Sequence, residues 1–271
     1  MKQFETIQYE ARAGVATVTL NRPDAFNALN RKLLSELLEA FQEMAGDPQT
    51  RAIVLTGTGR AFSSGQDLRD FSDDGVDPAA AVRDGLENGY APVIRAIRGI
   101  PKPVIGAING VAAGAGMSLA LSTDLRVASD RASFTLAFSR IALVPDAGAT
   151  FFLPQLVGLP RALELAWSSR RVLADEALAI GLVNQVVPAD ELMTASQELA
   201  EGLARGPALA LGLTKRAMLQ GLTGTLNQSL TTEVEMQQQC IVTDDFREGV
   251  QAFLEKREAR FGQRGEQVPE A

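Results

Sequence analysis

Two short apolar segments near the start of the chain are separated by a polar turn. Residues Ile7–Glu10 and Val15–Leu20 have the alternating, β-branched character of strands, and Arg12–Gly14 between them predicts a hairpin turn. From Asn30 to Met44 the apolar side chains recur at the spacing of an amphipathic helix, with Asn30 suited to cap its first turn. The segment Arg51–Gly57 is short, apolar and β-branched, which predicts a buried strand.

The middle of the chain continues this alternation of strand and helix. The acidic segment Phe71–Pro78 contains glycine and proline and predicts a mobile loop, placed to act as a substrate lid, before a helix over Ala79–Ile97. Residues Lys102–Ile108 predict a second buried strand, followed by a helix that carries Met117–Leu121. Further short strands are expected at 125–128 and 133–135. This order predicts βαβ units, a largely parallel sheet and therefore an α/β fold.

Helical patterns dominate after Pro145. Residues 174–182 predict a helix ended by Gly181 in the left-handed conformation, and 183–187 predict a brief strand. Further helices are expected to begin at Asp190 and Pro207 and to cover 225–241 and 244–260. We therefore expect a core over residues 1–200 and a helical C-terminal region over 201–271.

Composition excludes several classes of partner. The chain has 271 residues, and 46% of them are hydrophobic, which is enough for a large core. It carries 26 basic and 33 acidic side chains, a net charge of −7, and this excess of acid argues against nucleic acid as a partner. The first residues lack a secretory signal pattern and no apolar run is long enough to cross a bilayer, so we expect no membrane partner and a cytoplasmic location.

The absence of histidine narrows the chemistry further. Without it the chain cannot form a Ser-His-Asp or Cys-His triad, a histidine-ligated zinc site or a histidine acid–base catalyst. The single cysteine, Cys240, excludes an intramolecular disulfide and a cysteine-cluster metal site, and we expect it in the core. Acid–base chemistry is left to Asp, Glu, Lys, Tyr or activated water.

Two glycine-containing turns follow the two buried strands. Residues 61–68 read A-F-S-S-G-Q-D-L, and residues 109–117 read N-G-V-A-A-G-A-G-M. Small residues in such turns leave backbone N–H groups uncovered, and two N–H groups side by side can stabilise the oxyanion of a thioester enolate. The second turn is also compatible with close helix packing or with a dinucleotide loop, but a dinucleotide loop would require a third glycine near Leu119, and none is there.

Further motifs stand in a fixed order around the two turns. They are N-R-P at 21–23, N-A-L at 27–29, K-P-V at 102–104, Asp124, P-D-A-G at 145–148, Ala177 and G-L-V at 181–183. Together with the turns, this set resembles the crotonase (enoyl-CoA hydratase/isomerase) superfamily over nearly the whole chain. The resemblance implies a crotonase-like spiral of ββα units with C-terminal helices that mediate formation of a homotrimer, or of a hexamer built as a dimer of trimers. It implies no metal or redox cofactor.

Acyl-CoA thioesters are the substrates that this resemblance implies. The thioester oxygen would lie between the backbone N–H groups of Ser64 and Ala115. Glycines beside both positions, Gly65 and Gly114, permit close approach of the substrate, and the second turn opens a helix whose N-terminus favours an oxyanion.

For the CoA moiety, the resemblance implies contacts from several residues. They are Arg22, Ala25, the backbone of Ser64, Gly65, Gln66, Asp67 and Leu68, and Lys256 near the C-terminus. The alternative is that Lys256 lies on a solvent-exposed helix face and does not contact CoA. Asp67 and Asp124 lie next to strand ends, and we expect both to fix the local backbone.

Asp146 is the candidate proton carrier. Hydratases of the superfamily use two glutamates, and the matching positions hold Ser118 and Phe138. Asp146 matches the carboxylate of isomerases, where one group can remove a proton and return it elsewhere. The alternative role of Asp146 is to cap the N-terminus of a helix that begins near Ala147.

Residues 141–154 are most similar to the ring-epoxide isomerases of phenylacetate degradation. In this chain, the apolar side chains of Phe138, Leu143 and Val144 would keep water from the reacting carbons. We therefore expect an acyl-CoA isomerase of phenylacetate or fatty-acid degradation. A hydratase of β-oxidation and a non-catalytic CoA- or RNA-binding relative are the alternatives.

Overall fold

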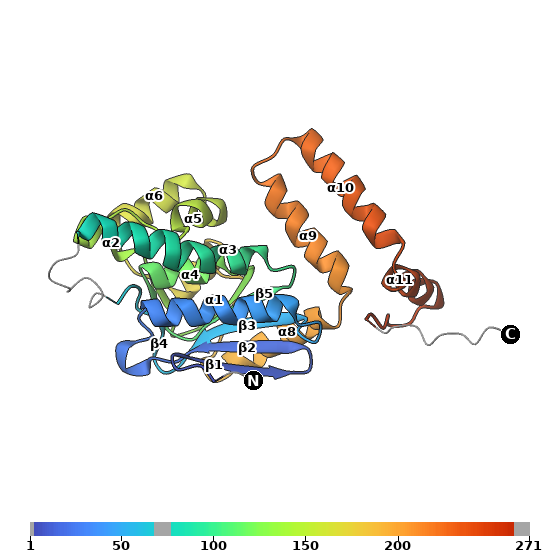
Figure 1. Ribbon diagram of the computed structural model, residues 1–271, viewed down its shortest axis with the longest axis horizontal. Helices are drawn as coiled ribbons and strands as arrows, with labels where there is room; N and C mark the ends of the chain where they lie inside the picture. The colour runs from blue at the N-terminus through green and yellow to red at the C-terminus, as the bar shows by residue number, and fades with distance from the viewer. Residues whose placement is uncertain (1–2, 68–76, 263–271) are drawn as a thin grey trace.

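The core of the protein is built on a six-stranded sheet (Figure 1). The computed structural model describes residues 3–67 and 77–262. The strands of this sheet are, in spatial order, β1 (Ile7–Arg12), β2 (Val15–Leu20), β3 (Ala52–Gly57), β5 (Val104–Ile108), β7 (Leu125–Ser129) and β10 (Gln185–Val187). β1 is antiparallel to β2, and the remaining pairs are parallel. Every residue of β3 and β5 is buried, which explains why both read as continuous apolar runs.

A second sheet of four short strands lies in the same spiral. It contains β4 (Ala61–Ser63), β6 (Val111–Ala113), β8 (Ser133–Thr135) and β9 (Val172–Leu173). The chain passes from the large sheet to the small one in each of the steps β3 to β4, β5 to β6 and β7 to β8. This repeated ββ step, followed by helices, confirms the predicted α/β spiral.

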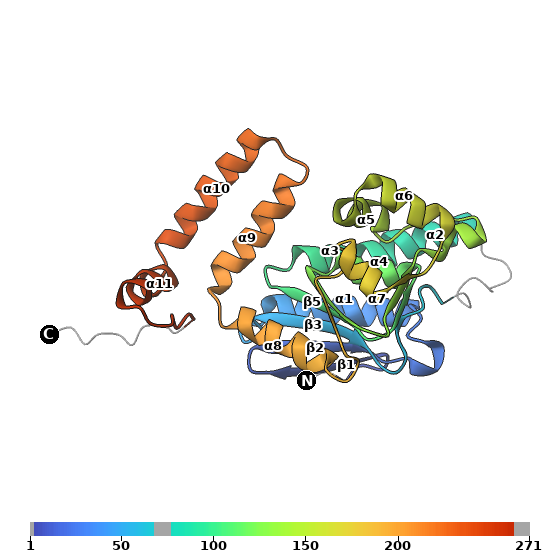
Figure 2. The same ribbon diagram turned by 180° about the vertical axis from the view of Figure 1, so that it is seen from behind.

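Helices cover both faces of the large sheet. α1 (Arg31–Gly46) lies on one face and α8 (Leu192–Ala204) on the other, as Figures 1 and 2 show together. The predicted cap of α1 is confirmed, because the Asn30 side chain accepts a hydrogen bond from the Leu33 N–H at 2.9 Å.

The remaining helices of the core are shorter. They are η1 (Pro23–Ala25), α2 (Pro78–Asp84), the π-helical turn η3 (Gly85–Tyr90), α3 (Ala91–Gly99), α4 (Ala115–Ser122), η4 (Ala137–Ile141), α5 (Ala149–Val157), α6 (Leu159–Ser168) and α7 (Ala174–Ala179). The helix predicted over 79–97 is therefore α2, η3 and α3 in succession. Gly181 has the predicted left-handed conformation, with φ of 78°. The loop predicted over 71–78 falls almost wholly outside the described residues.

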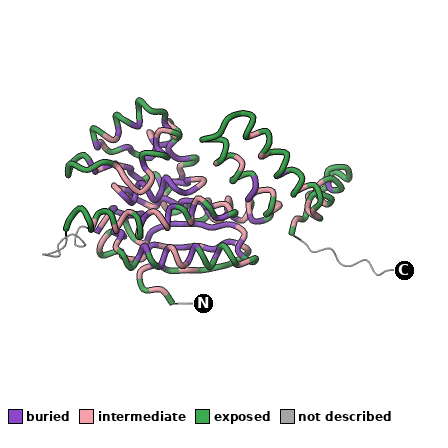
Figure 3. Tube along the Cα trace, turned by 45° about the horizontal axis from the view of Figure 1, so that its top comes forward, coloured by how far each residue is buried: buried purple, intermediate pink, exposed green. Residues whose placement is uncertain are grey.

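Three C-terminal helices extend away from the core: α9 (Ala208–Gly221), α10 (Leu226–Ile241) and α11 (Asp244–Glu255) (Figures 1 and 3). α11 ends five residues before the predicted Arg260, because Lys256 takes the left-handed conformation, with φ of 56°. Cys240 is half-buried on α10, so its expected place in the core is wrong. None of the helices in the described part of the chain is both long and apolar enough to cross a membrane.

Lys215 ties α9 to the core. Its ammonium group lies 2.8 Å from the Asp124 carboxylate and donates to the carbonyl oxygens of Ile97 and Lys102 at 3.1 and 3.2 Å. Asp124 also accepts a hydrogen bond from the Val104 N–H at 2.9 Å, so it fixes the local backbone as predicted.

Candidate active site

The two glycine turns meet at a cavity of about 850 Å³. Its wall contains Ser64, Gly65, Gln66, Gly114, Ala115 and Asp146. The rest of the wall comes from α1, from α2 and η3, and from the segment between Ala137 and Pro145. These six residues, all singled out from the sequence, thus line one cavity, although they come from three separate parts of the chain.

Close backbone contact between the turns depends on glycine. Gly65 has φ of 99°, and a Cβ atom placed on it would lie 2.8 Å from the Ala113 carbonyl oxygen and 3.4 Å from the Ala115 nitrogen. On the facing turn, a Cβ atom on Gly116 would lie 2.4 Å from the Ser63 carbonyl oxygen. Such distances leave no room for a side chain, so both glycines are required for the turns to meet.

Ala115 opens α4 at the cavity wall. The first N–H groups of a helix have no acceptor within the helix, and the helix dipole places partial positive charge there. Gly114, with φ of 51°, donates its own N–H to the Thr135 carbonyl oxygen at 2.9 Å and so orients this helix start. The Ala115 N–H is therefore placed to donate to an anionic oxygen in the cavity.

Asn27 holds the first turn from behind. It has φ of 54°, is fully buried, and donates from Nδ2 to the Ala61 carbonyl oxygen at 2.8 Å, while its own carbonyl accepts from the Ser63 hydroxyl at 2.8 Å. Beside it, the Ser64 N–H donates to the Phe26 carbonyl oxygen at 2.9 Å. The Ser64 N–H is thus turned into the protein, and its assignment as an oxyanion donor is wrong.

Gln66 directs its backbone N–H toward the other side of the turn. It forms an isolated parallel bridge with Leu29, in which the Leu29 N–H donates to Gly65 and the Asp67 N–H donates to Leu29, at 2.7 and 3.0 Å. In such a bridge the N–H of the middle residue points away from the bridge partner, so the Gln66 N–H points away from Leu29, and Gln66 lies in the cavity wall. The sequence does not reveal this choice between two neighbouring N–H groups, because it depends on the position of Leu29.

Asp146 is a half-buried carboxyl group without a compensating partner. Its Oδ1 atom has no hydrogen-bond partner among the described residues, and burial raises its pKa to about 6 from an ordinary value of 3.8. α5 begins at Ala149 with Gly148 as its N-cap and no capping side chain, so the alternative role of Asp146 as a helix cap is wrong. A carboxyl group with these properties is suited to exchange protons near neutral pH.

The two positions expected to carry glutamate in a hydratase hold no titratable group. The Ser118 hydroxyl is buried and donates to the Gly114 carbonyl oxygen at 3.3 Å, and Phe138 is buried in the cavity wall. Leu143 and Val144 are exposed by 47% and 74%. All three apolar residues expected to exclude water therefore line the cavity, and Phe138 is the only one of the three that is buried in the single chain.

The residues expected to bind CoA are only partly brought together. Arg22 forms an ion pair with Asp67 at 2.8 Å and also donates to the Ala28 carbonyl oxygen, so it stabilises the first turn from outside the cavity. Asp67 thus pairs with a side chain 45 positions away, and its predicted role of fixing the local backbone stays a prediction. Ala25 accepts a 3.3 Å hydrogen bond from the Ser64 hydroxyl. Lys256 follows α11, which Figure 1 shows at the opposite end of the molecule from α2, and it is not in the cavity wall; Leu68 lies outside the described residues.

A family model described as "Enoyl-CoA hydratase/isomerase" matches residues 10–264 of this chain. The chain belongs to this family. Within the family, it is 43% identical over 258 residues to "Probable enoyl-CoA hydratase" of Rhodobacter capsulatus, and 41% identical over 258 residues to "1,2-epoxyphenylacetyl-CoA isomerase" of Escherichia coli. Each match covers 95% of this chain and 98% of the relative.

Solved structures of the family agree with this assignment. The enoyl-CoA hydratase of Bacillus anthracis superposes with a TM-score of 0.90 at 36% identity, over 95% of this chain and 99% of that one. The predicted membership of the crotonase superfamily is therefore confirmed, and the protein is an enzyme of the enoyl-CoA hydratase/isomerase family.

Proposed function

We propose that the protein is an acyl-CoA isomerase in which Asp146 carries the proton. The observation that supports this most strongly is the Asp146 carboxyl group, half-buried in the wall of the cavity with an Oδ1 atom that accepts no hydrogen bond from the described residues. The positions of the two hydratase glutamates hold Ser118 and Phe138, so a single carboxylate must serve as both base and acid.

The reaction would proceed through an enolate. Asp146 removes a proton from the acyl chain, and the electron pair of the broken C–H bond moves into the thioester carbonyl. The Gln66 and Ala115 N–H groups donate to the resulting oxyanion, with the N-terminus of α4 adding favourable potential. Asp146, now protonated, returns the proton to a different carbon, so the double bond moves and no atom is gained or lost.

A product screen with an Asp146→Asn variant tests this proposal. The native protein should convert 3-enoyl-CoA thioesters to 2-enoyl-CoA without a change in mass. Asp146→Asn keeps the size of the side chain but removes the base, so turnover should fall by roughly a hundredfold to ten-thousandfold with little change in KM. The control is Asp190→Asn, at an exposed position outside the cavity wall. Near-native turnover of the Asp146 variant would overturn the assignment.

Hydration is the second candidate function. It is supported by the name of the Rhodobacter capsulatus relative, which is 43% identical to this chain. In that case crotonyl-CoA would gain one molecule of water and lose its conjugated absorbance. The same screen should include a ring-epoxide of phenylacetyl-CoA, because the relative named for that substrate is 41% identical.

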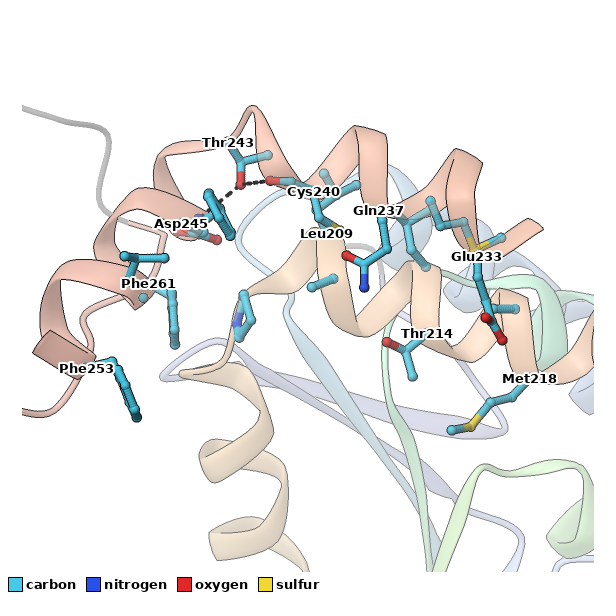
Figure 4. A pocket seen from close by; sticks show the side chains of 18 of the residues that line it. Leu209, Thr214, Met218, Glu233, Gln237, Cys240, Thr243, Asp245, Phe253 and Phe261 are labelled. Atoms are coloured by element: carbon cyan, nitrogen blue, oxygen red, sulfur yellow. Dashed lines mark hydrogen bonds between the residues drawn. The ribbon is translucent and has the colours of Figure 1, made fainter. Parts of the chain in front are cut away.

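We further propose that copies of the chain assemble through α9, α10 and α11. A groove of about 840 Å³ lies among these helices, with Met218, Phe253 and Phe261 in its wall (Figure 4). Exposed apolar side chains continue along α10 and α11, including Leu226, Leu230, Val234 and Leu254, which are each at least 50% exposed. Apolar patches of this kind indicate a protein partner, and a trimer or dimer of trimers would cover them with the same helices of neighbouring copies.

A further inference from the structure

A single π-helical turn forms part of the cavity wall. Residues 85–90 (G-L-E-N-G-Y) interrupt an otherwise continuous helix between Pro78 and Gly99, and five of these six residues line the cavity. π-Helical turns are rare and occur frequently at functional sites, because they shift the direction of the side chains that follow. Gly89 permits this turn to approach α1, since a Cβ atom there would lie 3.2 Å from the Leu34 side chain.

The π-helical turn ends at Tyr90, whose side chain faces inward. Tyr90 is only 5% exposed, and its hydroxyl donates a hydrogen bond to the Gln66 side-chain carbonyl oxygen. These residues lie 24 positions apart in the sequence, so this contact links the π-helical turn to the first glycine turn. The Gln66 backbone is meanwhile held by Leu29 on the opposite edge.

We infer that Tyr90 is a positioning residue for the oxyanion site. Its hydroxyl holds the Gln66 side chain, and the bridge to Leu29 holds the Gln66 backbone, so the Gln66 N–H keeps one direction relative to the Ala115 N–H. A preorganised donor stabilises the oxyanion without reorganisation during the reaction. This inference rests on the proposed function, because it requires the Gln66 N–H to contact the thioester oxygen.

Tyr90→Phe tests the inference, since it removes the hydroxyl and keeps the buried ring. We expect kcat to fall about fivefold to tenfold, with KM changed by less than about twofold. The reason is that the lost hydrogen bond orients the Gln66 N–H, which stabilises the transition state more than the bound substrate. The chain has only two tyrosines, and Tyr9→Phe, in β1 and outside the cavity wall, is the matched control. An unchanged kcat in a folded Tyr90→Phe protein would overturn the inference.

A second variant tests whether Tyr90 acts through Gln66. Gln66→Met removes the side-chain acceptor and retains the backbone N–H. The combined Tyr90→Phe and Gln66→Met variant should lose no more than about twofold beyond Gln66→Met alone, because both changes break the same contact. Losses that multiply would show that Tyr90 acts elsewhere and would overturn the inference.

A spectroscopic measurement separates this inference from the proposed function. An aryl-enoyl-CoA thioester, whose carbonyl is conjugated with the ring, absorbs at longer wavelength when that carbonyl accepts hydrogen bonds. The native protein and Tyr9→Phe should produce the full red shift on binding, and Tyr90→Phe a smaller one. Equal shifts in Tyr90→Phe and the native protein would overturn only the role of Tyr90. Binding without any shift in the native protein would overturn the oxyanion site itself, and with it the role of Tyr90.

Discussion

Gly65 packs against Ala113 so closely that a Cβ atom on residue 65 would lie 2.8 Å from the Ala113 carbonyl oxygen. This contact sets the distance between the two turns that supply the cavity with backbone N–H groups. Because φ at Gly65 is 99°, any other residue would also strain the backbone at this position.

Gly65→Ala should therefore separate the two turns. We expect a loss of about 2 kcal/mol or more in the free energy of unfolding and at least a tenfold loss of turnover. Gly46→Ala is the control, since Gly46 ends α1 and a Cβ atom there would contact nothing within 4 Å. Chemical denaturation and steady-state kinetics on the two variants check this expectation, which is contradicted if both variants behave alike.

The pH dependence of turnover should report Asp146. Burial raises the pKa of this carboxyl group to about 6, and the proposed reaction begins with the ionised form. We expect kcat/KM to rise with pH, to reach half of its maximum near pH 6, and to stay level up to pH 8. A profile that is flat between pH 5 and 8 would show that Asp146 does not titrate in the reaction.

The same carboxyl group should lower the stability of the folded protein at neutral pH. Its pKa is higher in the folded protein than in the unfolded chain. The contribution of this group to the free energy of unfolding is therefore fully present below about pH 4 and is lost as the pH rises through 6. Asp146→Asn removes this cost. We expect the variant to gain on the order of 1 to 2 kcal/mol relative to the native protein between pH 4 and pH 7, after allowance for the partial exposure of the group.

Thermal unfolding of both proteins across that pH range measures the difference. A melting temperature of Asp146→Asn that falls below the native value at pH 7 would indicate a stabilising role that the structure does not show.

Assembly through the C-terminal helices should depend on the apolar face of α10. Leu230→Glu with Val234→Glu places two charges on this exposed face, and light scattering should then give the mass of one chain, 28.9 kDa. Leu178→Glu is the control, because Leu178 is 44% exposed on α7. A native protein that already has the mass of one chain would refute the proposed assembly.

Local patterns in the sequence predict most of the elements correctly. Strands β3 and β5 are buried on both faces, so composition alone identifies them. Asn30 and Gly181 mark a helix start and a helix end through interactions within a few residues. The end of α11 is less predictable, because Lys256 adopts a left-handed conformation that is uncommon for a side chain of its type.

The site depends more on contacts between distant parts of the chain. The sequence identifies both turns and Asp146, but it cannot show which edge of the first turn faces the cavity. That edge is set by Leu29, which is 37 residues away from Gln66. The ion pair between Arg22 and Asp67 spans 45 positions, and it explains why an arginine expected to bind CoA lies outside the cavity wall.

The salt bridge between Lys215 and Asp124 connects α9, a helix of the proposed assembly surface, to the residues that follow α4. Asp124 lies just beyond the C-terminal end of α4, and Ala115 is the first residue of the same helix. α4 has eight residues, all of them buried, and spans about 12 Å between these two positions. If copies associate through α9 as proposed, we expect the position of α9 to affect the Ala115 N–H through Asp124 and α4. Turnover per chain that stays constant while the assembly is diluted to single chains would exclude such an effect.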